Sequence, residues 1–194
     1  MTTFYAQSST DLSTVIWNDQ AGGGGSNGTP GNGDTCDLNN KTLVMDITTF
    51  PTSGTLTAIQ DTHATGTGCI TLAMSGSTTY HINATNINAA KNFTGMIQTS
   101  GAAPSATLAL SGNVTGGSAG YGVHHYSTGS LTCLAVAGGS GGYAGITIDT
   151  GNVTCTSVTG GSNSSMGILI ITSCIINCTS VTGNGGVGIQ YGIV

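Results

Sequence analysis

Residues 131–139 read LTCLAVAGG, residues 153–161 read VTCTSVTGG and residues 176–184 read INCTSVTGN. The cysteine occupies the third place in every copy, so successive cysteines are roughly 22 residues apart. A fixed period of about 20–50 residues is the sequence signature of solenoids and related repeat architectures. The pattern therefore predicts a chain that winds into stacked coils, each of which places its cysteine over the cysteine of the coil before.

A second set of equivalent positions accompanies this repeat. Gly followed by Val or Ile recurs at 121–123, 144–146, 166–168 and 187–189, and residues 113–117 (NVTGG) are an earlier copy of the first pattern without cysteine. Each coil should hold two or three short strands that turn at Gly-Gly, Gly-Ser or Asn-Gly. Stacking such coils about 4.8 Å apart buries their inward faces and pairs their backbones. Leucine-rich repeats share the period, but their Leu-x-x-Leu-x-Leu frame is absent.

The expected fold is all-β, with a right-handed parallel β-helix (β-solenoid) in the C-terminal half and an irregular β-rich N-terminal region. Val, Ile, Thr and Gly dominate, and the near absence of Glu, Lys and Arg disfavours helix. We expect an opening and attachment region at 1–47, irregular β-rich coils at 48–111 and solenoid repeats at 112–194. The first 111 residues form either a separate domain or simply irregular first coils.

Charge is scarce, because the 194 residues include only two lysines and seven aspartates, for a net charge of −5. The apolar share of 38% is patterned, which argues against disorder. Without arginine the chain lacks the donor fork that binds phosphate, so we expect no nucleic-acid partner. No run of about 18 apolar residues predicts a membrane helix. The N-terminus lacks the features of a signal peptide, so we expect release by another route, such as host lysis.

The repeat cysteines Cys133, Cys155 and Cys178 are expected to form a structural column inside the coils. Free cysteine behaves as a small buried hydrophobe, and no cysteine pair has the short paired spacing of a zinc site. We therefore expect buried, reduced thiols and no metal centre. The other cysteines are Cys36, Cys69 and Cys174. A disulfide among these three is compatible with the sequence but is not specified by it.

Titratable side chains do not indicate catalysis. His124 and His125 adjoin on an expected strand, so their side chains should point to opposite faces, while His63 and His81 are isolated. Only one of the seven aspartates, Asp149, lies within the repeats. A glycosidase needs a facing pair of carboxylates, and a polysaccharide lyase needs a basic residue to take a proton. We therefore expect no catalytic residues, no cofactor and no enzymatic activity.

Four tyrosines of the repeat region lie near expected turns: Tyr121, Tyr126, Tyr143 and Tyr191. Exposed aromatic rings combine an apolar body with a polar tip, and they can contact a glycan or a partner protein. The alternative is that these rings pack along the edges of the coils and serve structure alone. The sequence leaves both interpretations open.

The N-terminal stretch resembles the opening of many phage and bacterial surface β-helix proteins. The resemblance rests on Trp17-Asn18-Asp19, on GTPGNGDT at 28–35 and on LNNKTLVMD at 38–46. These provide a tryptophan, a glycine-rich gap, a Pro-x-x-Gly-Asp turn and a strand that ends the first coil. The resemblance covers about the first fifty residues. It implies that a β-helix opens here and that the protein works on a virion or cell surface, and it carries over no catalytic residue.

The expected function is that of a non-enzymatic structural protein on the exterior of a tailed-phage virion, as a capsid decoration (cement) protein or a head fibre. The sequence closes on Gly192-Ile193-Val194, in mid-coil, and an open strand edge invites pairing. We therefore expect a homotrimer that also contacts the major capsid protein or another virion protein. The alternatives are a tail-fibre or cell-surface adhesin that binds glycans, and a subunit of an extracellular filament.

Overall fold

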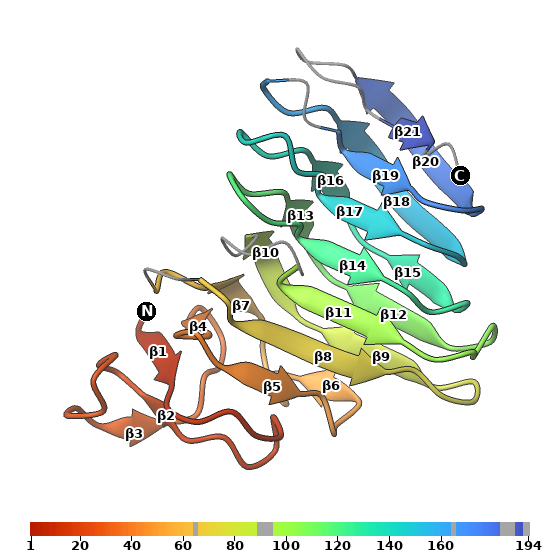
Figure 1. Ribbon diagram of the computed structural model, residues 1–194. Coiled ribbons are helices and arrows are strands. Elements are labelled where there is room, and N and C mark those ends of the chain that lie inside the picture. Colours follow the sequence, from red (N-terminus) through yellow and green to blue (C-terminus); the bar gives the residue numbers. More distant parts are fainter. Residues whose placement is uncertain (64–65, 89–94, 164–165, 183–188, 192–194) are drawn as a thin grey trace.

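The computed structural model describes residues 1–63, 66–88, 95–163, 166–182 and 189–191, and all regular elements in these ranges are strands. The chain winds through about six turns of a β-solenoid whose coils stack in parallel (Figure 1). The prediction of an all-β fold built from stacked coils is confirmed. Within the described ranges, no helix is long and apolar enough to cross a membrane.

The coils form three faces, which we name A, B and C. Face A contains β4 (Thr35–Asp37), β7 (Leu56–Gln60), β10 (Ala84–Asn88), β13 (Asn113–Thr115) and β16 (Ala135–Ala137). Face B contains β5 (Thr42–Val44), β8 (Cys69–Ala73), β11 (Ile97–Ser100), β14 (Val123–His125), β17 (Ile146–Ile148), β19 (Ile168–Ile170) and β21 (Ile189–Tyr191). Face C contains β6 (Thr49–Phe50), β9 (Thr79–Ile82), β12 (Thr107–Leu110) and β15 (Ser130–Thr132).

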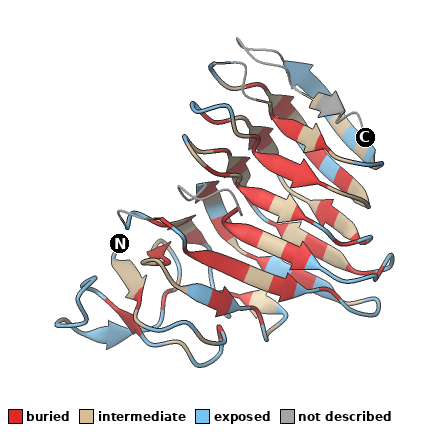
Figure 2. Ribbon diagram, in the orientation of Figure 1, coloured by how far each residue is buried: buried red, intermediate tan, exposed pale blue. Residues whose placement is uncertain are grey.

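Two long strands, β18 (Asn152–Thr159) and β20 (Ile175–Thr182), run from face C into face A. The first half of β18 pairs with β15 and its second half pairs with β16. Faces A and C are thereby joined in one 14-stranded sheet, whereas face B is a separate 7-stranded sheet. The solenoid core lies between these sheets, and Figure 2 shows the buried positions running along the stacked strands.

Pairing in register places equivalent residues of successive coils next to one another. On face A, Val114 pairs with Val136 and Val136 pairs with Val158, and all three are buried. On face B, Ile146 pairs with Ile168 in the same way. These two columns are the two phases of the sequence repeat. β-Branched side chains suit such positions because they pack well against neighbours on a pleated surface.

The coils begin earlier than the recognisable repeat. Cys36 pairs with Ile59, Ile59 pairs with Ile87 and Ile87 pairs with Val114, so the face A column runs through residues 48–111. The coils of this part are longer than those of the repeat. Both the strands of face B and the connections from face B to face C contribute to the extra length. Strands β8 and β11 have five and four residues, against three in β14, β17 and β19, and the connection to face C is also longer.

Residues 1–34 cover the first coil. β1 (Thr3–Ala6) pairs with β4 in parallel, and β2 (Trp17–Asn18) and β3 (Asn27–Gly28) extend this edge with antiparallel pairing. The Trp17 ring stacks on Phe50 of the first coil, with ring centroids 6.0 Å apart. Covering a sheet edge in this way removes a template for unwanted pairing with other chains.

At the other end, β20 is the last long strand in the described ranges. Its side chains Ile175 and Val181 are 62% and 51% exposed. Much of this strand belongs to the exposed class, which is pale blue in Figure 2. Residues 183–188, which complete the third copy of the repeat and begin the following one, lie outside the described residues, as do residues 192–194.

A glycine ladder explains the Gly-Gly pairs of the repeat. A Cβ atom on Gly139 would lie 2.1 Å from the carbonyl oxygen of Gly117, and one on Gly161 would lie 2.3 Å from the oxygen of Gly139. Both distances are far below van der Waals contact. The turns that leave face A therefore stack backbone on backbone from coil to coil, and only glycine provides that approach.

Candidate functional site

Four rings and one carboxylate gather on the outer side of face B, and we call them the aromatic cluster: Tyr121, His124, Tyr126, Tyr143 and Asp149. The rings of Tyr121 and Tyr143 meet edge to face, with centroids 5.4 Å apart. The His124 ring lies 5.7 Å from Tyr121 and only 3.7 Å from Tyr126, measured between centroids. The cluster therefore spans two neighbouring coils.

Strand alternation places these residues on the outside. In β14, Val123 and His125 are fully buried while His124 is half-buried on the opposite side, which confirms the prediction that the adjacent histidines face opposite ways. Tyr126 follows two residues after His124, so it emerges on the same side, 47% exposed. Tyr121 precedes β14, and Tyr143 holds a similar place before β17 in the next coil.

Electrostatics in the cluster centre on Asp149. Its Oδ1 atom lies 3.5 Å from Nε2 of His124. Burial lowers the pKa of His124, and the nearby Asp149 carboxylate opposes this shift without cancelling it. Partial burial raises the pKa of the Tyr126 hydroxyl, and Asp149 adds to that rise. At neutral pH the cluster therefore presents a neutral imidazole, phenol hydroxyls and one carboxylate, a mixture of donors and acceptors beside ring faces.

A buried hydroxyl lies on the same side of the sheet. Thr147 occupies the outward position of β17, between His124 on one neighbouring strand and Leu169 on the other. The residue is 2% exposed, and its Oγ1 atom has no hydrogen-bond partner within the described part of the chain. Leaving such a buried polar group without a partner costs about 1–3 kcal/mol.

The structure brings together three of the four tyrosines selected from the sequence. Tyr121, Tyr126 and Tyr143 belong to the aromatic cluster. The fourth, Tyr191, pairs through its backbone with Ile170 in the last described strand of face B, and its side chain lies outside the described part of the structure. Sequence reasoning missed His124 and Asp149 as cluster members, since only the coil register places Asp149 beside a histidine of the preceding coil.

The three repeat cysteines form a stack at the corner between faces C and A. Cys155 pairs with Cys178 in register, and the thiols of Cys133 and Cys155 are hydrogen-bonded to each other. Only Cys155 is fully buried, at 6% exposure, whereas Cys133 and Cys178 are half-buried. Cys133 and Cys178 are therefore less buried than expected, whereas Cys155 at the same corner is buried as expected.

The remaining cysteines lie at separate places, and all six cysteines are free thiols. Cys36 belongs to the interior column of face A, where burial and two nearby aspartates raise its pKa. Cys69 lies on face B beside Thr42 of the preceding coil, and burial raises its pKa as well. Cys174 is half-buried just before β20.

The two buried carboxylates hold loops of the first coils in place. Asp37 accepts hydrogen bonds from the Asn39 amide at 2.9 Å and from the Thr62 hydroxyl at 2.6 Å. Asp61 accepts a hydrogen bond from the Gly68 amide at 2.6 Å. Both side chains therefore complete turns, as short polar side chains often do.

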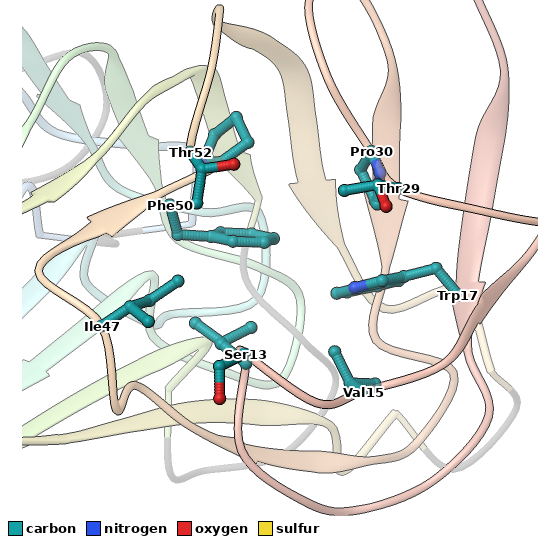
Figure 3. Close-up of a pocket in the computed structure, with 10 residues that line it drawn as sticks. Ser13, Val15, Trp17, Thr29, Pro30, Ile47, Phe50 and Thr52 are labelled. Atoms are coloured by element: carbon teal, nitrogen blue, oxygen red, sulfur yellow. The ribbon is translucent and has the colours of Figure 1, made fainter.

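A cavity of about 260 Å³ lies between the N-terminal cap, residues 1–34, and the first coil (Figure 3). Trp17 and Phe50 line it from opposite sides, and the aliphatic side chains of Val15 and Ile47 extend the apolar lining. The ten lining residues are Leu12, Ser13, Val15, Trp17, Thr29, Pro30, Ile47, Phe50, Pro51 and Thr52. The cavity is part of the junction that closes the solenoid, and the single tryptophan was its only sequence signal.

Among these features the aromatic cluster holds the richest mixture of groups for contacting another molecule. It offers ring faces, hydroxyls, an imidazole and a carboxylate within two neighbouring coils. Its polar groups are suited to reversible contact through stacking and hydrogen bonds. Comparison of the chain with protein-family models, with curated proteins and with solved structures finds no match.

Proposed function

We propose that this chain is a non-enzymatic structural protein on the exterior of a tailed-phage virion, where it decorates the capsid or forms a head fibre. The observation that supports the proposal best is the continuous ladder of paired strands from β4 to β20. Such a ladder pairs the backbone along the whole stack and makes a stiff element of constant repeat, the property that a surface scaffold requires.

The outer surface of the ladder is consistent with this role. Thr132 pairs with Thr154 and Thr154 pairs with Asn177, so uncharged polar side chains follow one another up face C. With charged residues at only 5% of the chain, contact with a neighbouring shell would depend on shape and hydrogen bonds. The resemblance of residues 17–46 to the opening of virion and cell-surface β-helix proteins supports the same setting.

Labelling of native particles tests the proposal. Particles are purified from cultures of the source organism after lysis, and an antibody against the recombinant chain is imaged on them by immunogold electron microscopy. We expect label on the outside of intact heads, and we expect mass spectrometry to find the chain in the particle fraction. Recovery of the chain only in the particle-free fraction would contradict the proposal.

The proposed assembly is a homotrimer, which sedimentation equilibrium tests directly. The chain has a mass of 19.1 kDa, and we expect a species of three times that mass. A strictly monomeric protein across the accessible concentration range would contradict the trimer. Long polymers in the same experiment would instead favour the alternative of an extracellular filament subunit.

The aromatic cluster favours a second candidate function, glycan binding by a tail fibre or cell-surface adhesin. Tyr126 is half exposed beside His124 and Asp149, so a sugar ring could stack on its free face while its hydroxyls reach polar groups. Stacking of this kind is worth about 0.5–1.5 kcal/mol for each aromatic contact.

A glycan array tests this candidate with a matched pair of variants. Tyr126→Ala removes the most exposed ring of the cluster, and Tyr5→Ala removes a half-buried tyrosine of the N-terminal cap as the control. Glycan binding by the wild type should fall about fivefold or more in Tyr126→Ala and stay unchanged in Tyr5→Ala. Equal binding by both variants would remove the cluster from consideration.

A further inference from the structure

The stacked cysteines have the spacing of a disulfide between coils. Cys155 and Cys178 are direct partners on neighbouring parallel strands. Cys133 lies beside Cys155 on the other side, because its amide donates a 3.0 Å hydrogen bond to the carbonyl oxygen of Thr154. Neighbouring strands are about 4.8 Å apart, which falls within the Cα separation of about 4.4–6.8 Å found in disulfides.

The thiols of Cys133 and Cys155 lie on neighbouring coils and interact through a hydrogen bond. The Cys133 thiol donates to the Cys155 sulfur, and this hydrogen bond lowers the pKa of Cys155 below its ordinary value. The same hydrogen bond and burial raise the pKa of Cys133. Cys155 is therefore the member that ionises first, and the thiolate is the nucleophile of thiol chemistry.

A surface hollow is lined by one member of this pair, Cys155. The hollow has a volume of about 330 Å³ and is lined by Thr154, Cys155, Asn177, Cys178 and Thr179. A small reagent can therefore reach the Cys155 sulfur from the side of Cys178. The other buried cysteines differ, because Cys36 pairs with Ile59 and Cys69 pairs with Thr42, so neither has a thiol on these neighbouring strands.

We propose that Cys133 and Cys155 form an oxidisable thiol pair that closes into a disulfide between two neighbouring coils. A low-molecular-weight disulfide such as oxidised glutathione supplies the oxidising equivalents. The Cys155 thiolate attacks one sulfur of that disulfide, forming a mixed disulfide and releasing one glutathione thiolate. Cys133 then loses its proton and attacks the Cys155 sulfur, which releases the second glutathione. The two cysteines lose two protons and two electrons in total, and two glutathione thiols are produced.

The disulfide would fasten one coil to the next. It closes a loop across roughly 22 residues, and cross-linking a loop of that size restricts the unfolded chain. From the usual stabilisation by such loops, we expect the melting temperature to rise by about 5–10 °C. The site is independent of the proposed structural role, although an oxidising extracellular setting would keep the disulfide closed.

The experiment uses the full chain with the three cysteines outside the stack replaced. Cys36→Val matches the aliphatic column around that residue, and Cys69→Ala and Cys174→Ser remove the other two. The folded protein is incubated with oxidised glutathione, the free thiols are alkylated, and the unfolded product is cleaved before aspartate. Cleavage at Asp149 separates Cys133 from Cys155 and Cys178, because no other aspartate follows it.

We expect the fragment 61–148 to be joined to the fragment 149–194 in the oxidised sample and to be released by reduction. Adding Cys178→Ser should leave this link intact, and adding Cys155→Ser should abolish it. A link that survives in Cys155→Ser, or an oxidised pair confined to the fragment 149–194, would overturn the assignment. So would unreacted thiols in a protein whose circular dichroism shows the folded β-structure.

Discussion

The solenoid has wide coils at 56–110 and narrow coils at 113–182, and both use the same three faces. The corner between faces C and A shows how the change is made. In the wide part this position holds Ile82 and then Leu110, which are paired in register. In the narrow part it holds Cys133 and Cys155. Smaller side chains at one corner thus accompany a shorter coil, and the ladder of backbone pairs is unaffected.

The junction between wide and narrow coils contains a buried polar pair. Thr99 of the last wide coil and His125 of the first narrow coil are neighbours in the face B column, between Leu72 and Ile148. The Thr99 hydroxyl and His125 Nδ1 are 2.8 Å apart, and His125 Nε2 lies 3.2 Å from the carbonyl oxygen of Gly129. A neutral imidazole satisfies both contacts, accepting from the threonine and donating to the carbonyl.

The largest expected effect comes from truncating one column in each part. Ile87→Ala in the wide part should lower the free energy of unfolding by about 2–5 kcal/mol, because a fully buried side chain leaves a cavity. Val136→Ala in the narrow part removes one methylene fewer than Ile87→Ala. Its loss in the free energy of unfolding should therefore be smaller than that of Ile87→Ala by about 0.5–1.5 kcal/mol. Chemical denaturation measures both, and a larger loss in Val136→Ala would reverse the comparison.

The next effect concerns the turns of the narrow coils. Gly139→Ala should lower the free energy of unfolding by about 1–3 kcal/mol, because the added methyl overlaps the carbonyl oxygen of Gly117. Gly31→Ala is the control, since a Cβ atom there meets nothing within 4 Å. Thermal melts of the two variants should separate clearly, and equal melting temperatures would show that the glycine ladder does not stack as described.

The buried histidine at the junction between wide and narrow coils, His125, should make the free energy of unfolding depend on pH. Burial lowers the pKa of His125 below the value of about 6.5 of an unfolded histidine. The unfolded chain then binds more protons in this range, so stability is complete above pH 6.5 and falls as the pH drops through that value. Burial lowers the pKa of His124 as well, which adds to the same trend.

His125→Leu separates the two histidines. The variant should be less stable at pH 8, because the Thr99 hydroxyl loses its partner, but its stability should fall less between pH 7.5 and pH 5. His81→Leu, at an exposed position, should keep the wild-type dependence. Denaturation midpoints across this pH range provide the comparison, and identical slopes in all three proteins would exclude His125 as the cause.

The smallest expected effect lies on the exposed side of β20. Ile175 is in register with Asn152 of the preceding coil, and its side chain is largely exposed. Ile175→Asn should therefore change the free energy of unfolding by no more than about 0.5 kcal/mol. A loss of several kcal/mol by urea denaturation would mean that this side chain is covered by other parts of the protein.

The sequence was sufficient to predict the narrow coils. Val114, Val136 and Val158 are 22 residues apart and are surrounded by repeated glycines, so period and turn chemistry agree. The wide coils could not be predicted from a sequence period. The separations between Ile59, Ile87 and Val114 differ from 22 residues and from each other. Loop length can vary freely on the outside of a solenoid, whereas strand register is fixed by the core.

The aromatic cluster was predictable only in part. Tyr121, Tyr126 and Tyr143 were selected because they lie near turns of the repeat. Their meeting with His124 and Asp149 depends on which coils are neighbours and on side-chain direction, neither of which the local sequence specifies. The half-burial of Cys133 was missed for a similar reason, since exposure at a corner depends on how sharply the chain turns there.

A crystal structure of the purified chain tests the central claim, that residues one coil apart are direct neighbours, most directly. The α-carbons of Val114, Val136 and Val158 should lie in one line with about 4.8 Å between neighbours, and those of Cys133, Cys155 and Cys178 in a second line with the same spacing. Separations well beyond the distance between paired strands, or side chains of one set on different faces, would contradict the stacked-coil account.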